Sequence, residues 1–407
     1  MAKLLVTLLV MLFASHTLAT ETLSVFETGN LSTVCCHVNQ SQLGDDSPPK
    51  PLLIVRPVED GTYPVILFLH GTCLQNSYYT QLFEHIASHG YILVAPQLYG
   101  CTEKLHIIFP WELDIPKLPV CGDTELEWAA QVAKWLYSGL QSVLPGSVKG
   151  DLQNKLALAG HSRGGKIAFA LALGKAKTSL QEVNISALLG VDPVAGLGKE
   201  CSEPIILRDG TFDLSVPVTI IGTGLGDQPK HPHFPFWPAC APDNLNHKEF
   251  FSKSKPPKGH FVITEYGLLD MLNDDLTSDF VVQFFNDLCT ANGSGSNAPM
   301  RRGVGGITVA FLEYNFQGKT KDYLTIVRDR SAVSPVKLDD VEFDPAYLTE
   351  KTPDSLKACP QELLCWLWPW GHAQLTSMMS TCSSAEPIFG NPPSLQSSGL
   401  CHPQFSS

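Results

Sequence analysis

The sequence predicts an α/β protein, with a mostly parallel β-sheet and helices on both of its faces. Short apolar runs alternate along the chain with segments whose apolar residues recur at helical spacing, a pattern typical of βαβ units. One of these units contains a glycine-rich bend with a serine at its apex. A length of 407 residues and a hydrophobic content of 44% fit a globular chain of one or two domains.

The expected elements follow one another over the first three quarters of the chain. Strands are expected where short apolar runs lie between turn residues, at 51–56, 65–69, 91–95, 156–160, 185–191, 216–221 and 261–264. Helices are expected where apolar residues recur at helical spacing, at 78–88, 123–143, 165–173, 276–288 and 304–316. The segments at 99–122 and 229–257 are interpreted as long loops.

The two ends of the chain differ from this central part. Lys3, an apolar run over 4–14 and a small-residue site ending at Ala19 are typical of a secretory signal peptide over 1–19. The apolar run is too short to span a bilayer, and no later stretch reaches about 18 apolar residues. We therefore expect secretion, with a plastid transit peptide as the alternative. The expected organisation is completed by a polar segment at 20–48, an α/β domain at 49–330 and a Ser/Pro/Cys-rich extension at 331–407.

Cysteine content and charge narrow the classes of function. The chain has 12 cysteines, and an even number in a secreted chain predicts disulfides of undetermined pairing. No C-x-x-C pair occurs, which argues against structural zinc. A net charge of −12 argues against a nucleic-acid partner. Glycosylation sequons that suit the same compartment lie at Asn30, Asn39, Asn184 and Asn292.

The serine bend is the main candidate for chemistry. A strand pattern leads into Gly160-His161-Ser162-Arg163-Gly164, and a helical pattern follows. In a nucleophile elbow of this G-x-S-x-G form, small residues two before and two after the serine let strand and helix approach closely. The elbow lifts the serine hydroxyl above the sheet, beside helix N–H groups that favour negative charge. A chance G-x-S-x-G in a loop is the alternative, and the flanking strand and helix argue against it.

Groups that assist Ser162 are expected at the carboxyl ends of neighbouring strands, where parallel sheets gather their active groups. One oxyanion N–H is assigned to Arg163, and the second to Thr72 or Cys73 in the loop after the 65–69 strand. His70, in the same loop, is interpreted as a packing residue.

Two aspartates are candidates for the acid that orients a catalytic base. Asp192 closes a buried apolar run, where a carboxylate is costly without a function. Asp227 lies in a glycine-rich loop, where a turn role is the ordinary explanation. We assign Asp192 as the acid.

The base is harder to place. The chain order Ser, acid, His puts a histidine after the last strand, where the sequence reads Tyr266-Gly-Leu-Leu-Asp270. His260 begins that strand, so a rise of about 3.3 Å per residue leaves it roughly 20 Å from the carboxyl end. The loop before that strand emerges at the correct edge and carries His231, His233 and His247. Packing is the commoner role for each of these alone, and His247 is selected as the candidate base.

Long blocks of the chain resemble the plant chlorophyllase family. The blocks lie between about residues 50 and 330 and include Phe68-Leu-His-Gly71, Ala157-Leu-Ala-Gly-His-Ser-Arg-Gly-Gly165, Asp192-Pro-Val-Ala-Gly196 and Asn246-His-Lys-Glu-Phe-Phe251. Members of this family are serine α/β hydrolases that cleave the phytyl ester of chlorophyll to chlorophyllide and phytol. The resemblance implies an α/β-hydrolase fold, with Ser162 as nucleophile and Asp192 as acid. It also implies a catalytic histidine at the position of Leu268, and leucine cannot accept a proton.

Two classes of function are therefore expected. The first is a carboxylic-ester hydrolase acting on chlorophyll or a similar bulky apolar ester, with a substitute base such as His247. The second is a catalytically impaired relative that binds a tetrapyrrole or lipid. A secreted lipase with a lid from the apolar 363–370 patch is a further alternative. Ester hydrolysis of this kind needs no cofactor. A calcium site around 270–275 is left open, although its spacing matches no EF-hand loop.

Overall fold

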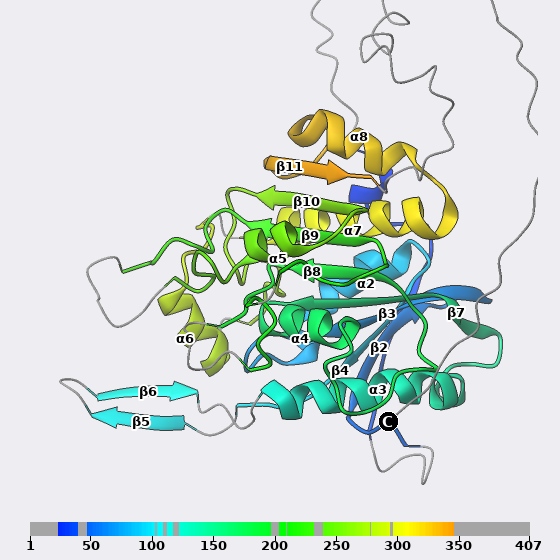
Figure 1. Ribbon diagram of the computed structural model, residues 1–407, viewed down its shortest axis with the longest axis horizontal. Coiled ribbons are helices and arrows are strands. Elements are labelled where there is room, and N and C mark those ends of the chain that lie inside the picture. The colour runs from blue at the N-terminus through cyan, green and yellow to red at the C-terminus, as the bar shows by residue number, and fades with distance from the viewer. Residues whose placement is uncertain are drawn as a thin grey trace, which may run out of the picture. The chain divides into compact units, whose positions relative to one another are not determined.

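The computed structural model describes residues 23–345, except for 40–46, 102–103, 109–111, 117–121, 197–202, 209, 232–238, 277 and 294–295. The described residues belong to one compact unit, Met1–Tyr347. Its centre is a nine-stranded sheet in the order β1-β2-β4-β3-β7-β8-β9-β10-β11 (Figure 1). The strands of this sheet are β1 (Thr33–Val38), β2 (Leu52–Pro57), β3 (Gly61–Leu69), β4 (Ile92–Pro96), β7 (Val148–His161), β8 (Ile185–Val191), β9 (Val218–Thr223), β10 (Lys258–Ile263) and β11 (Leu338–Asp344).

The sheet is parallel through its middle and antiparallel at its edges. Strands β4, β3, β7, β8, β9 and β10 run parallel to one another. Strands β1, β2 and β11 are joined to the rest by antiparallel pairs. In the central register, Leu69 of β3 is level with Gly160 of β7, and His161 is level with Val191 of β8. The expected oxyanion loop, serine and acid therefore emerge at one edge of the sheet.

Helices cover both faces of this sheet, as the alternating pattern predicts (Figure 1). Helices α3, α4 and α5 lie on one face, and α2 and α7 lie on the other. Most core positions of the central strands are buried valine, leucine, isoleucine and alanine, as expected for a parallel sheet covered on both sides. The helices are α2 (Thr80–Ser88), α3 (Gly122–Val143), α4 (Arg163–Ala172), α5 (His247–Lys253), α6 (Phe280–Leu288), α7 (Ala298–Gln317) and α8 (Lys321–Asp329). Among the described residues, none of the helices has the length and apolar character needed to cross a membrane.

The structure corrects the expected elements at the margins of the sheet. Strand β1 lies in the segment expected to be an irregular polar region, and β11 lies beyond the expected end of the domain at residue 330. Both are half-exposed edge strands, so their sequences lack the continuous apolar runs that mark the buried strands. The expected loop at 99–122 contains a two-stranded hairpin, β5 (Lys104–Ile108) with β6 (Glu112–Pro116).

Two disulfides join described cysteines: Cys73 to Cys101 and Cys240 to Cys289. Cys35 and Cys36 of β1 are free thiols. The expected signal peptide and the 363–370 patch lie outside the described residues, as do six cysteines: Cys121, Cys201, Cys359, Cys365, Cys382 and Cys401.

Candidate active site

Ser162 lies between the end of β7 and the start of α4, on a strained bend. Its backbone angles are φ 54° and ψ −122°, a region that non-glycine residues seldom enter and that is typical of strained functional sites. A methyl group added at Gly160 would lie 2.3 Å from the carbonyl oxygen of Gly164, and one added at Gly164 would lie 2.2 Å from the carbonyl oxygen of Leu69. The two glycines of the G-x-S-x-G pattern are therefore required by close backbone contacts, as a nucleophile elbow demands.

The loop after β3 forms a tight turn next to this elbow. The N–H of Leu74 donates to the carbonyl of Gly71 at 3.2 Å, and Cys73 has a φ of 61°. The N–H of Gly71 donates to the hydroxyl of Tyr79 at 3.0 Å. Within the described part of the chain, the N–H of Thr72 has no acceptor. Arg163 is the first residue of α4. Its N–H group therefore lies at the N-terminal end of the helix, where the helix dipole favours negative charge.

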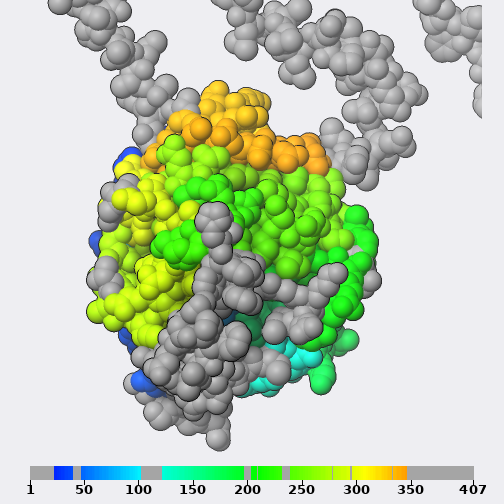
Figure 2. All heavy atoms as spheres, turned by 90° about the vertical axis from the view of Figure 1, so that its left-hand side faces the viewer, coloured from blue at the N-terminus to red at the C-terminus, as the bar shows by residue number. Residues whose placement is uncertain are grey.

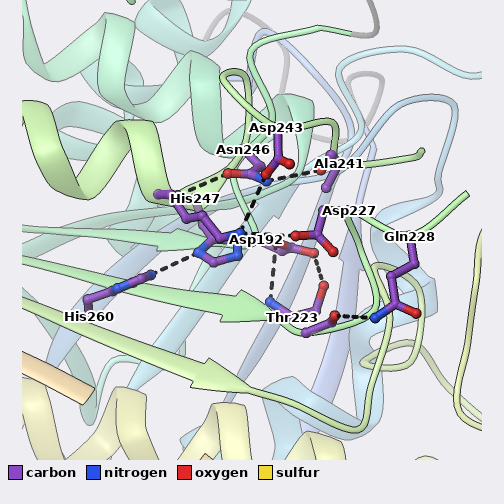
Figure 3. A network of polar contacts seen from close by, with 11 residues as sticks. Asp192, Thr223, Asp227, Gln228, Ala241, Asp243, Asn246, His247 and His260 are labelled. Carbon is purple, nitrogen blue, oxygen red and sulfur yellow. Dashed lines mark hydrogen bonds and ion pairs between the residues drawn. The ribbon is translucent and has the colours of Figure 1, made fainter. Parts of the chain in front are cut away.

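Asp192 follows β8 directly and is completely buried. Its N–H donates to the carbonyl of Ile221 at 2.6 Å, which fixes the backbone at the sheet edge. One carboxylate oxygen accepts a hydrogen bond from the hydroxyl of Thr223, and the other accepts from the N–H of Thr223 at 3.4 Å (Figure 3). No imidazole hydrogen-bonds to this carboxylate among the residues that the structure describes.

The surroundings of Asp192 disfavour its charged form. Burial raises the pKa of its carboxyl from 3.8 to about 7, and the negative charge of Asp227 adds to the increase. The two hydrogen bonds from Thr223 act in the opposite direction. Asp192 is thus divided between its neutral and charged forms near pH 7, as expected for a buried carboxyl without a cationic partner.

Leu268 lies next to the elbow and not at a distance from it. The Nε2–H group of His161, the residue before Ser162, donates to the carbonyl of Leu268 at 2.9 Å. The other ring nitrogen of His161 lies 2.7 Å from the hydroxyl of Tyr79. Because Nε2 carries the proton, Nδ1 accepts from the Tyr79 hydroxyl, which itself accepts from the N–H of Gly71. The Leu268 side chain is buried and supplies no titratable group.

His247 packs against Gly222, one residue before the end of β9. It is the first residue of α5 and is buried, and a methyl group added at Gly222 would lie 2.3 Å from its Nδ1. That nitrogen lies 2.8 Å from Nε2 of His260, in the middle of β10 (Figure 3). Burial lowers the pKa of His247 to about 3, and the neighbouring His260 and Lys248 contribute to the decrease.

No hydrogen bond in the described residues connects His247 to Ser162 or Asp192. Gly222 has no side chain, and the imidazole of His247 occupies the space that this leaves on the sheet. These contacts give no support to His247 as the base, which stays a prediction. His260 is the third residue of β10 (Lys258–Ile263). At about 3.3 Å per residue it lies about 10 Å from the carboxyl end, nearer than the roughly 20 Å expected for a residue that begins the strand.

The other candidates have structural contacts. Nε2 of His70 accepts from the N–H of Leu98 at 3.1 Å, so its Nδ1–H donates to the carbonyl of Gly71 at 2.9 Å and both ring nitrogens are engaged. Asp227 forms an ion pair with Lys248 at 3.0 Å. The ring of His231 contacts the carbonyl of Asp287 at 3.0 Å. His233 lies outside the described residues.

The acidic segment at 270–275 is used to hold loops together. The Asp270 carboxylate accepts from the N–H groups of Gly267 and Asn292, both at 2.7 Å. Asp274 forms an ion pair with Arg301 at 2.6 Å. Over the described ranges, no group of three or more His, Cys, Asp or Glu side chains is arranged to hold a metal ion.

Comparison with known proteins agrees with this geometry. The family model described as Chlorophyllase matches residues 21–345. The chain belongs to the chlorophyllase family. It is 44% identical to "Chlorophyllase-1, chloroplastic" of Citrus unshiu over 328 residues, which is 80% of this chain and 90% of that protein. It is also 44% identical to "Chlorophyllase-1" of Arabidopsis thaliana over 323 residues, 78% of this chain and 91% of the relative. Identity to "Chlorophyllase-2" of Arabidopsis thaliana is 40% over 315 residues, 76% and 92% of the two chains.

Membership of the chlorophyllase family makes the chain a relative of carboxylic-ester hydrolases, and the sheet and helices are consistent with the α/β-hydrolase fold. The family match begins before β1 and ends after β11, so both edge strands belong to the family domain.

Sequence reasoning missed Thr223, which holds Asp192, and Tyr79, which links Gly71 to His161. Neither residue carries a sequence signal, because each acts through contacts between distant segments.

Proposed function

We propose that this chlorophyllase-family chain hydrolyses the phytyl ester of chlorophyll, or a similar bulky apolar ester, through Ser162. The observation that carries the proposal is the strained elbow, which holds Ser162 at φ 54° with glycines in close backbone contact on both sides. Strain of this kind persists only where the surrounding structure enforces it, and it is characteristic of nucleophile elbows. The names of the relatives supply the substrate class.

The proposed chemistry assigns a role to each described group. The Ser162 oxygen attacks the ester carbonyl, and the N–H groups of Thr72 and Arg163 hydrogen-bond to the oxyanion that forms. The alcohol leaves, and water then hydrolyses the acyl-enzyme to release the acid. Asp192 stands at the position of the acid, with Thr223 as its present partner.

We propose that proton transfer from Ser162 is the slow step of the reaction. Leu268 occupies the place next to the elbow at which the family resemblance implies an imidazole, and it binds no proton. For His247 to act as the base, its ring would have to leave His260 and turn toward the sheet edge. Loss of one triad member costs several orders of magnitude but leaves residual rate from binding and the oxyanion hole. We therefore propose slow hydrolysis that depends on Ser162.

The second candidate function is binding of a tetrapyrrole or lipid without turnover. The contact between Asp192 and Thr223 favours it, because this contact satisfies the acid without a histidine. We place either ligand beside Ser162, at the carboxyl edge of the sheet, which is the side of the molecule that Figure 2 faces. Secretion through the 1–19 segment remains our proposal for localisation, with the plastid, named for the Citrus relatives, as the alternative.

The test compares turnover of chlorophyll a and of p-nitrophenyl esters by the natural chain, Ser162→Ala and Leu268→His. We expect Ser162→Ala to abolish turnover and Leu268→His to increase it by about a hundredfold or more, because an imidazole beside the elbow supplies the missing base. Leu269→His is the matched control, since Leu269 is equally buried and we expect no gain from it.

The outcomes separate the two candidates. Equal turnover by the natural chain and Ser162→Ala, together with no labelling of Ser162 by an ester-mimicking phosphonate, refutes the hydrolase. Saturable binding of chlorophyllide by the same protein then supports the binding function. A large gain from Leu268→His over an undetectable natural rate also supports it.

A further inference from the structure

The short segment Gln97–Cys101, which follows β4, contacts the turn that carries Thr72. The side-chain amide of Gln97 donates to the carbonyl of Leu74 at 3.2 Å. The N–H of Leu98 donates to the ring of His70 at 3.1 Å. Cys101 is joined by a disulfide to Cys73, the residue after Thr72. One neighbouring segment therefore holds the turn at three residues: His70, Cys73 and Leu74.

The same segment also contacts Arg163. The ring of Tyr99 lies 5.5 Å from the guanidinium carbon of Arg163, within reach of a cation–π interaction, and 4.9 Å from the ring of His70. On its other side, Nε of Arg163 donates to the carboxylate of Glu125 at 2.5 Å. Glu125 and Tyr99 are both buried. The residue after the nucleophile is thus held between α3 and the segment after β4.

These contacts join two groups that come from different elements. Thr72 lies in the loop after β3, and Arg163 begins α4, about ninety residues later in the chain. The rate of a reaction at Ser162 depends on both N–H groups pointing to one oxygen, and a misplacement of about 1 Å can cost roughly a hundredfold.

We propose that residues 97–101 form a clasp that aligns the two oxyanion N–H groups, with Cys101 and Tyr99 as positioning residues. This inference rests on the proposed ester hydrolysis and extends it to residues that do not touch the substrate. Cys101 acts through the disulfide on the Thr72 turn, and Tyr99 acts through its ring on Arg163. The second disulfide, Cys240–Cys289, ties other loops and has no part in the clasp.

The test breaks each disulfide separately. In Cys101→Ala we expect kcat for a p-nitrophenyl ester to fall about tenfold or more, since loss of one oxyanion donor costs about 10²–10³ and misalignment costs a part of that. We expect KM to stay within about twofold, because the substrate carbonyl gains these contacts fully only in the transition state. Cys289→Ala is the matched control, and its kcat should remain within about twofold of the natural chain.

A second measurement does not depend on turnover. A phenylboronate forms a tetrahedral adduct with a serine hydroxyl, and ¹¹B NMR detects the tetrahedral boron. We expect Cys101→Ala to weaken this adduct by the same factor by which it lowers kcat/KM. Tyr99→Leu should do the same, whereas Tyr99→Phe, which keeps the ring over Arg163, should restore both values to within about threefold of the natural chain.

The proposed clasp and the proposed ester hydrolysis are tested by different outcomes. An unchanged boronate affinity in Cys101→Ala overturns the clasp, whatever the turnover. A loss of the same size in Cys289→Ala also overturns it, because the effect is then a general one of disulfide removal. If Ser162→Ala turns over esters as fast as the natural chain, the proposed hydrolysis is wrong, and the boronate affinities still decide whether residues 97–101 align the two donors.

Discussion

The buried carboxyl of Asp192 makes the stability of the protein depend on pH. Burial raises its pKa from 3.8 to about 7. The folded protein therefore keeps this proton between roughly pH 4 and pH 7, while the unfolded chain releases it. Because the folded state binds more protons in this window, the free energy of unfolding falls as pH rises through it. At about 1.36 kcal/mol per pKa unit, the total loss is about 4 kcal/mol.

Asp192→Asn removes this dependence without removing the contacts. The amide can accept from the N–H of Thr223 and donate to its hydroxyl, so both polar partners are kept. We expect the variant to equal the natural protein in stability near pH 4 and to exceed it by about 2–4 kcal/mol at pH 8. The gain at neutral pH would accompany a loss of turnover, since a neutral amide cannot stabilise a cationic base.

Urea unfolding followed by tryptophan fluorescence, repeated from pH 5 to pH 8, measures the difference. Asp227→Asn is the control, because Asp227 forms an exposed ion pair with Lys248 and should change stability by less than about 1 kcal/mol at every pH. A gain in Asp192→Asn that is the same at pH 5 and pH 8 would show that the carboxyl does not titrate in this range. No gain at pH 8 would show that its burial is not costly.

Three other substitutions test neighbouring contacts. Gly164→Ala places a methyl group 2.2 Å from the carbonyl oxygen of Leu69, so we expect a loss of about 3 kcal/mol or more in thermal unfolding and loss of phosphonate labelling. Thr223→Val removes the hydroxyl that donates to Asp192; it should cost about 1–3 kcal/mol in urea unfolding at pH 8 and move the acid limb of the pH–rate profile upward. His247→Ala should lower stability by about 1–3 kcal/mol; if His247 is the base, turnover also falls to the Ser162→Ala rate, whereas turnover within about twofold of the natural chain shows that it is not.

The sequence predicts the centre of the site because its signals there are local. Ser162 is marked by glycines two residues away on each side, and Asp192 by a carboxylate at the end of an apolar run. Both rules follow from where parallel strands end, and the structure places both residues at that edge. The buried central strands are predicted for the same reason, since each is a continuous apolar run.

The remaining features depend on contacts between segments far apart in the chain. The prediction of His247 rests on the edge at which its loop emerges, but the space above Gly222 and the ring of His260 determine where its imidazole lies. Nothing in the residues around His247 indicates that space. The edge strands β1 and β11 are missed because half-exposed strands alternate polar and apolar residues over only a few positions.

The hydrogen bond from His161 to Leu268 has a consequence for how this family can change its chemistry. The carbonyl that holds the loop at residue 268 belongs to the main chain, so this contact is available whichever side chain the residue carries. A proton acceptor and an inert aliphatic group can therefore replace one another there while the scaffold, the serine bend and the ligand surface remain in place. Under the proposed function, a single substitution at residue 268 separates slow from fast hydrolysis, and the contact from His161 holds the loop in both cases.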